Sequence, residues 1–174
     1  MSKLTPVKRE TLILIWNTDT RRVPVEVMLT SAQMESGIGE GLYDLTAERY
    51  EKVSHERALA NPEKWGAYGL AAEDWTSWGP FQMMGFVLRE VGYYGIWEQQ
   101  RLLVENEELP AEDYLRLCMR AYDKHMARLI RKRGLPGAFK AYNGAGLAAE
   151  RYQSRARLVW ERLRRELKTR DENV

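Results

Sequence analysis

The stretch VPVEVMLTSAQMESG, Val23–Gly37, decides the fold, because it predicts a buried helix with an acidic residue at its end. Pro24 suits the first helical turn, where its missing N–H leaves no hydrogen bond unmade. Apolar residues then recur at the i, i+3, i+4, i+7 spacing of a core-facing stripe: Val25, Met28, Leu29 and Ala32. The stripe continues to Glu35 and Ser36, just before Gly37, a typical helix end. This spacing aligns a carboxylate with the apolar face of the helix.

The predicted position of Glu35 has a chemical consequence. Partial burial and the negative end of the helix dipole both disfavour a charged carboxylate, so we expect its pKa to be raised. A carboxyl group with a raised pKa suits general-acid chemistry near neutral pH. The alternative is that Glu35 is a solvated residue in a fraying last turn, and the helix alone does not decide between the two.

Length and composition indicate one globular domain over residues 1–174, with 44% hydrophobic and 30% charged residues. The single cysteine, Cys118, excludes an intrachain disulfide and a cysteine-rich metal site. His55 and His125 lie far apart in sequence, so no histidine metal motif is visible. We therefore expect neither a metal nor an organic cofactor.

The net charge is only +2, but basic residues gather in two segments, residues 116–133 and 151–170. Such segments are usually solvated, although they also favour anionic partners such as nucleic acid or a cell-envelope surface. The sequence carries no nucleic-acid-binding motif, so we expect no nucleic-acid partner. The apolar run TLILIW is too short for a signal peptide, and no apolar span of about 18 residues occurs. We expect a protein made in the cytoplasm.

The rest of the chain reads as mainly helical. We expect helices over residues 5–16, 96–106, 111–133 and 148–168, and a short helix over 139–146 that ends in glycines. The helix over 111–133 has its own apolar stripe, Leu115, Cys118, Met119 and Tyr122. Alternation over residues 42–54 weakly predicts a strand, and the alternative is a helix that begins at Thr46. Residues 55–75 read as irregular, and residues 77–86 read as a tight turn that feeds a short apolar helix.

Three segments stand out together: MESG at 34–37, SWGPFQMMGF at 77–86 and AYNGAG at 141–146. In this order they resemble the lysozyme-like superfamily, which includes goose-type lysozymes and soluble lytic transglycosylases. The resemblance is closer to a phage and bacterial N-acetylmuramidase family and runs from about Val23 to Leu163. That family has an E-R-H element after the acid, where this chain has Glu48-Arg49-Tyr50. The resemblance implies a mainly α, lysozyme-like helical domain with a small β-hairpin beside the cleft.

The resemblance also assigns roles to residues of the first two segments. It places the catalytic acid at Glu35, beside Ser36, which either hydrogen-bonds near the acid or simply ends the helix. Gln82 either orients the substrate or acid, or satisfies the backbone of a loop. Ser77 and Trp78 are expected to line the cleft. Met83, Met84 and Phe86 are expected in the core.

In the third segment, Tyr142 and Asn143 are candidates for contacting the acid or a sugar N-acetyl group. The alternative is a helix cap with Asn143 in a turn, a position that asparagine suits.

Whether the active site needs a second carboxylate depends on the reaction that it catalyses. An inverting hydrolase needs a base that holds water, with the two carboxyl groups roughly 6.5–9.5 Å apart. Glu48 is the best candidate, and Asp44 and Glu40 are reserves. The alternative role of Glu48 is a surface ion pair with Arg49 or Arg57. Lytic transglycosylases use one glutamate as both acid and base and need no second carboxylate.

The resemblance implies a monomeric, peptidoglycan-degrading N-acetylmuramidase of the phage endolysin kind that acts on glycan strands. Such an enzyme would reach the cell wall from the cytoplasm through a membrane lesion made by another protein, and the basic helix over 148–168 would touch the anionic envelope. One rival is a lytic transglycosylase on the same fold. The other is a non-catalytic glycan-binding module of a phage structure.

Overall fold

The computed structural model describes residues 7–19, 21–36, 42–43, 52–66, 72–91 and 111–171 of the chain. The elements run in this order: β1 (Val7–Lys8), α1 (Arg9–Thr18), α2 (Val25–Ser36), β2 (Leu42–Tyr43), α3 (Lys52–Leu59), α4 (Pro62–Gly66), η1 (Ala72–Trp75), β3 (Ser77–Trp78), β4 (Met83–Met84), α5 (Gly85–Arg89), α7 (Ala111–Asn143) and α8 (Gly146–Asp171). Strand β1 pairs antiparallel with β2, and β3 pairs antiparallel with β4. The mainly helical fold class is confirmed.

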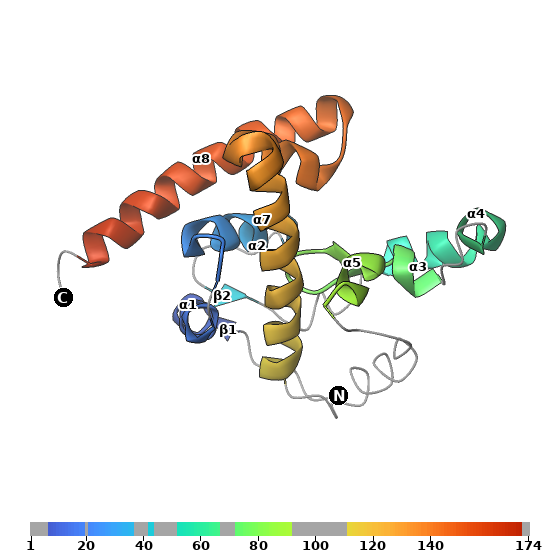
Figure 1. Ribbon diagram of the computed structural model, residues 1–174, viewed down its shortest axis with the longest axis horizontal. Helices are drawn as coiled ribbons and strands as arrows, with labels where there is room; N and C mark the ends of the chain where they lie inside the picture. Colours follow the sequence, from blue (N-terminus) through green and yellow to red (C-terminus); the bar gives the residue numbers. More distant parts are fainter. Residues whose placement is uncertain are drawn as a thin grey trace.

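Helix α7 runs through the middle of the molecule, with α1 and α2 on one side and α5 on the other (Figure 1). Helix α8 packs on both α2 and α7, and its C-terminal part extends away from the body (Figure 1). Helices α3 and α4 project on the opposite side from the C-terminus. Within the described part of the chain, no helix has the length and hydropathy needed to cross a bilayer.

Helix α2 is the buried helix that the sequence predicts. Met28, Leu29 and Ala32 are fully buried, and the backbone N–H groups of Val27 and Met28 donate to the carbonyl of Pro24 at 3.0 and 3.2 Å. Pro24 therefore stands immediately before the helix, where it needs no N–H. The helix ends at Ser36, so Glu35 lies in its last turn, as predicted.

Tyr122 of α7 is the centre of the core. Its ring stacks on Phe81 at a centroid distance of 4.5 Å and meets Trp16 and Tyr142 edge-on at 6.1 and 5.8 Å. Its hydroxyl donates to the Val27 carbonyl at 3.1 Å and lies 2.7 Å from the Ser31 hydroxyl. Because a phenol has one proton, Ser31 must be the donor in the second bond. These contacts join α1, α2, α7 and the segment between β3 and β4.

The segment 77–86 differs from its prediction. Residues 77–84 form the β3–β4 hairpin, with Ser77 opposite Met84, and the helix begins only at Gly85. The backbone N–H of Gln82 donates to the Gly79 carbonyl at 3.0 Å, which closes the turn. Gly79 and Gln82 both have positive φ, 68° and 47°, and a right-handed helix excludes such values. The small β-hairpin therefore comes from this segment.

The N-terminal predictions also need correction. The strand predicted over 42–54 is wrong at its end, because α3 begins at Lys52, and only Leu42–Tyr43 is described as a strand. The irregular reading of 55–75 is wrong as well, since this region includes most of α3, all of α4 and η1. Side chains of Glu56, Arg57 and Leu59 are exposed, so α3 shows no clear apolar stripe to read. The first predicted helix begins later, after β1, and the helix predicted over 96–106 lies outside the described residues.

The C-terminal half follows the prediction with one difference. Helix α7 is interrupted at Gly134 (φ 68°, ψ 169°), directly after the predicted end of the helix over 111–133, and a second helical segment continues to Asn143. Gly146, expected to end a helix, instead begins α8 with φ 80°.

Candidate active site

Glu35 opens into a cleft of about 510 Å³. Its side chain is half-buried, and its Oε1 atom is shielded from solvent. The described residues that line the cleft come from α2, β3–β4, α5 and α7: Glu35, Ser77, Gln82, Met83, Met84, Phe86, Val87, His125, Ala141, Tyr142, Asn143 and Gly144. The three segments singled out in the sequence thus meet in one cleft.

Three tyrosines surround the acid. The pKa values of Tyr122, Tyr142 and Tyr152 are all raised, by burial first and also by the negative charge of Glu35. Tyr152 belongs to α8, and its buried hydroxyl interacts with Glu35, which raises the pKa of Tyr152 further. All three phenols stay neutral, and the carboxyl group therefore sits against an aromatic, poorly hydrated wall.

Tyr142 holds the cleft together. Its hydroxyl donates to the Phe81 carbonyl and lies 3.0 Å from the Met83 sulfur. The end of α7 is thereby fixed to the β3–β4 hairpin. The hydroxyl is used inside the protein and is not presented to a sugar, which favours a positioning role for Tyr142. Its neighbour Asn143 is exposed in the cleft wall at the last residue of α7, and Gly144 ends the helix with φ 113°.

Gln82 satisfies the backbone of a loop, which is one of the two roles considered for it, and it also lies in the cleft wall. Its side-chain amide donates to the Gly79 carbonyl at 3.0 Å, so it supports the hairpin, and the same residue lines the cleft. Its φ of 47° lies in the left-handed region, which is uncommon for a residue with a Cβ. Strain of this kind persists where the surrounding structure enforces it, and it gathers at functional sites.

Of the remaining candidates, one lies where it was predicted and two do not. Ser77 lines the cleft, with its hydroxyl 3.7 Å from the Met84 sulfur. Trp78 is only 2% exposed and lies in the core, so its predicted place in the cleft wall is wrong. Phe86, predicted as core, is 37% exposed and lines the cleft, where its ring lies 5.5 Å from that of Trp75. Successive side chains of a strand point to opposite faces, and in β3 this directs Trp78 toward the core.

Other predictions fall outside the described residues. The side chain of Ser36 and the candidate bases Glu48, Asp44 and Glu40 are among them, so their roles stay predictions. Among the described residues that line the cleft, Glu35 is the one carboxylate. Over the same described ranges, no group of three or more His, Cys, Asp and Glu residues is placed to hold a metal ion.

The sequence reasoning missed His125 and Tyr152. The apolar stripe of α7 includes Cys118 and Tyr122, and one further turn of the same stripe reaches His125. Likewise, Tyr152 follows Ala149 by three residues and precedes Ala156 by four, on the buried face of α8. Extending each stripe by one turn, as was done for Glu35, would have found both residues.

His125 is a neutral hydrogen-bond donor in the cleft wall. Its Nδ1 lies 2.9 Å from the Arg128 guanidinium, which can only donate, so the ring proton must be on Nε2. Burial first, and then the Arg128 charge, lower the pKa of His125. His125 therefore offers an N–H group to a ligand at neutral pH, and not a basic nitrogen.

The strain at Gln82 yields a prediction of stability. We expect Gln82→Gly to be more stable than Gln82→Ala by about 1 kcal/mol, because glycine adopts positive φ without a steric cost. Both variants lose the same side-chain hydrogen bond, so the comparison isolates the backbone. Urea unfolding measures the difference, and an alanine variant at least as stable as the glycine variant would contradict it.

His125 predicts a pH dependence of folding. Because its folded pKa is below the ordinary value of 6.5, the unfolded chain binds more protons between those two pKa values. The free energy of unfolding should therefore rise with pH through that window and fall as the medium is acidified. We expect His125→Gln to flatten this slope in chemical denaturation at several pH values, with His55→Gln as the control. An unchanged slope in His125→Gln would refute the prediction.

Comparison with known proteins agrees with this site. A family model described as Muramidase, N-acetylmuramidase, matches residues 16–164. No curated protein and no solved structure matches the chain. The matched span runs from α1 into α8 and includes Glu35 and all three cleft segments. The chain therefore belongs to the N-acetylmuramidase family, whose members are peptidoglycan-cleaving enzymes of the lysozyme type.

Proposed function

We propose that the enzyme hydrolyses the β-1,4 bond between N-acetylmuramic acid and N-acetylglucosamine, with Glu35 as the general acid. One observation carries the proposal. A half-buried carboxyl group at the end of a buried helix opens into the cleft formed by the three motif segments.

The chemistry follows from the surroundings of Glu35. Glycosidic cleavage needs a proton on the bridging oxygen as positive charge develops on the sugar. A carboxyl group that is half-buried in this way, at the negative end of a helix dipole, meets the two conditions that disfavour a carboxylate charge. Glu35 can therefore keep a proton until the leaving oxygen takes it.

Other cleft residues supply binding and orientation. The exposed ring of Phe86 and the half-buried Met84 offer an apolar surface to sugar rings. Asn143, Ser77 and the Nε2–H of His125 offer polar groups to hydroxyl and N-acetyl groups. Glu48 remains our candidate for activating water.

A lytic transglycosylase is the second candidate. It needs no second carboxylate, so Glu35 alone would serve as its acid and base. In that reaction the same glutamate takes a proton from the sugar's 6-hydroxyl, which attacks the anomeric carbon and gives a 1,6-anhydro product. Both reactions begin with the same acid.

The first test is Glu35→Gln, which retains size and hydrogen bonding but removes the transferable proton. We expect it to lower the rate of peptidoglycan cleavage by about 10²–10⁴-fold, the usual contribution of a general acid. Binding to purified cell wall should be retained. If the native protein clears no wall under any condition but still binds it, a non-catalytic glycan-binding module replaces the enzyme proposal.

Mass spectrometry of the digest separates the two reactions. Reducing muramic acid ends mean hydrolysis, whereas anhydro ends mean transglycosylation. Glu48→Gln adds a second criterion. It should abolish cleavage if Glu48 activates water, and it should leave the rate nearly unchanged in a single-glutamate transglycosylase.

We further propose an endolysin role, in which an enzyme made in the cytoplasm reaches the wall through a lesion opened by another protein. The exposed face of α8 supports contact with an anionic envelope, since Arg151, Arg155 and Arg165 are exposed there. Arg162 does not belong to this surface. It donates to the Gln33 side chain at 3.1 Å and thereby links α8 to α2.

Reversing Arg155 and Arg165 to Glu tests this contact. Each basic residue near an anionic surface contributes about 1 kcal/mol, so lysis of whole envelopes should fall at least about tenfold at low salt. Cleavage of purified wall should change little. Lys132→Glu with Arg133→Glu is the charge-matched control on α7. Equal losses on both substrates would count against the envelope contact.

A further inference from the structure

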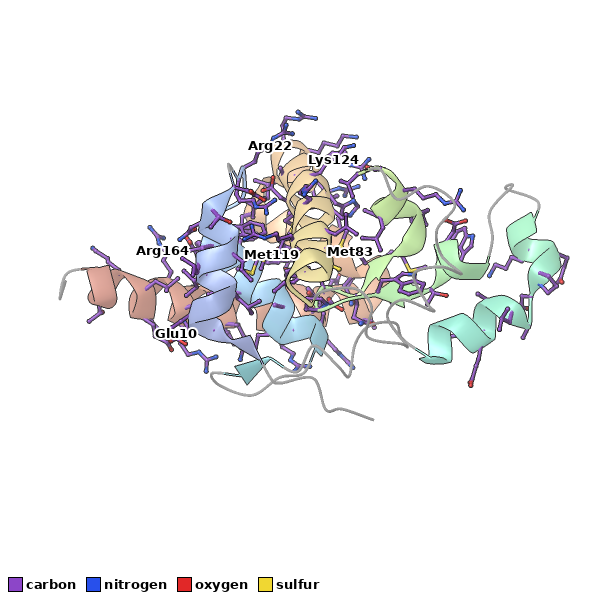
Figure 2. All side chains as sticks on the ribbon, turned by 90° about the horizontal axis from the view of Figure 1, so that it is seen from below. Glu10, Arg22, Met83, Met119, Lys124 and Arg164 are labelled. Atoms are coloured by element: carbon purple, nitrogen blue, oxygen red, sulfur yellow. The ribbon has the colours of Figure 1, made fainter. Side chains whose placement is uncertain are left out.

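A second pocket, of about 430 Å³, lies where the α1–α2 connection, the end of α5 and the middle of α7 meet. Its charged lining is Arg22, Glu90, Lys124, Arg128 and Arg131. Figure 2 shows Arg22 and Lys124 at the same end of the molecule, beside α7. Four cations thus share a concave site with one carboxylate. We call this site the basic pocket.

The acidic groups nearby are already engaged. The Glu90 carboxylate lies 3.7 Å from the Arg128 guanidinium, and the Glu90 carbonyl accepts from Lys124 at 2.5 Å. Asp123 is nearly buried and accepts the backbone N–H groups of Arg22 and Val23 at 2.9 and 3.0 Å.

Two of the cations are available to a ligand. The side chains of Arg22 and Arg131 are exposed and form no ion pair with any described residue. Guanidinium groups bind carboxylates and phosphates through two parallel hydrogen bonds, which suits recognition of a planar anion. The basic pocket is therefore equipped to take an anionic ligand.

The basic pocket adjoins the catalytic cleft. On α5, Val87 lines the cleft, and its carbonyl accepts the backbone N–H of the pocket residue Glu90 at 3.1 Å. On α7, His125 lines the cleft and is hydrogen-bonded to the pocket residue Arg128. Because residues three apart on a helix are neighbours on its surface, the lining of the cleft and the lining of the basic pocket meet on α5 and on α7.

We propose that the basic pocket binds the carboxylates of the peptide stem carried by muramic acid, while the glycan strand occupies the cleft. This inference rests on the proposed function. The stem leaves the sugar through the lactyl group and bears free carboxylates, so it places negative charge beside the strand. The enzyme then prefers peptide-bearing strands to stripped glycan, because the stem adds ion pairs that a naked strand lacks.

The test compares two substrates: soluble peptidoglycan strands with their stem peptides, and the same strands after enzymatic removal of the peptides. The variant is Arg22→Gln with Arg131→Gln, which spares Lys124 and Arg128 and their contacts. Lys132→Gln with Arg133→Gln is the control, since it removes the same charge from exposed positions of α7 that do not line the pocket.

We expect the double variant to lose about tenfold in kcat/KM on peptide-bearing strands, mainly through KM, as for partly exposed charge-assisted hydrogen bonds. On stripped strands the kcat/KM of the double variant should equal that of the native enzyme. The kcat/KM of the control variant should equal the native value on both substrates. Equal losses on both substrates, or no loss on either, would overturn the proposal. So would a loss of binding to anionic phospholipid vesicles without any discrimination between the strands, which would assign the pocket to phosphate.

A failure of the proposed function gives a different result. In that case the native protein cleaves neither substrate. Binding of a fluorescent stem tetrapeptide then still tests the pocket. Weaker binding by the double variant than by the control supports the inference, and equal binding refutes it.

Discussion

The buried hydroxyl of Tyr122 is the interaction on which the rest of the structure depends. It links α7 to α2 through the Val27 carbonyl and the Ser31 hydroxyl, in a region without access to water. A buried hydrogen bond is worth most when breaking it strands its partners, and here the buried hydroxyls of Tyr122 and Ser31 would be stranded together. Ser31 lies one helical turn before Glu35, so fixing Ser31 against α7 also fixes where the acid emerges. The position of Glu35 in the cleft is thus set by the core.

The same core supports a cleft that departs from local preferences. Gln82 is held at positive φ although it is not a glycine, and His125 is held neutral beside an arginine. Neither feature improves folding by itself. The hairpin that holds Gln82 is kept against α7 by the stacking of Phe81 on Tyr122 and by the bond from Tyr142 to the Phe81 carbonyl. Stability from the aromatic core is what allows strain at the site.

The sequence predicted the parts of the fold that depend on apolar periodicity. The spacing of Met28, Leu29 and Ala32 gave both α2 and the place of Glu35. The β3–β4 hairpin could not be read in the same way, because the left-handed conformation of Gln82 is imposed by tertiary contacts and not by a glycine. Helix α3 was not predicted, because its exposed residues leave no apolar stripe with helical spacing. The position of Trp78 was not predicted, because a two-residue strand gives too little alternation to show which way a side chain points.

The distribution of charge separates binding from chemistry. Among the described residues that line the cleft, none is lysine or arginine. Under the proposed function this matters, because a cation beside Glu35 would stabilise its ionised form and weaken it as an acid. The basic residues instead line the neighbouring pocket and the exposed face of α8. At these places they can attract an anionic polymer at a distance while the acid keeps its neutral, aromatic surroundings. Under the proposed function, one peptidoglycan strand would contact both places at once.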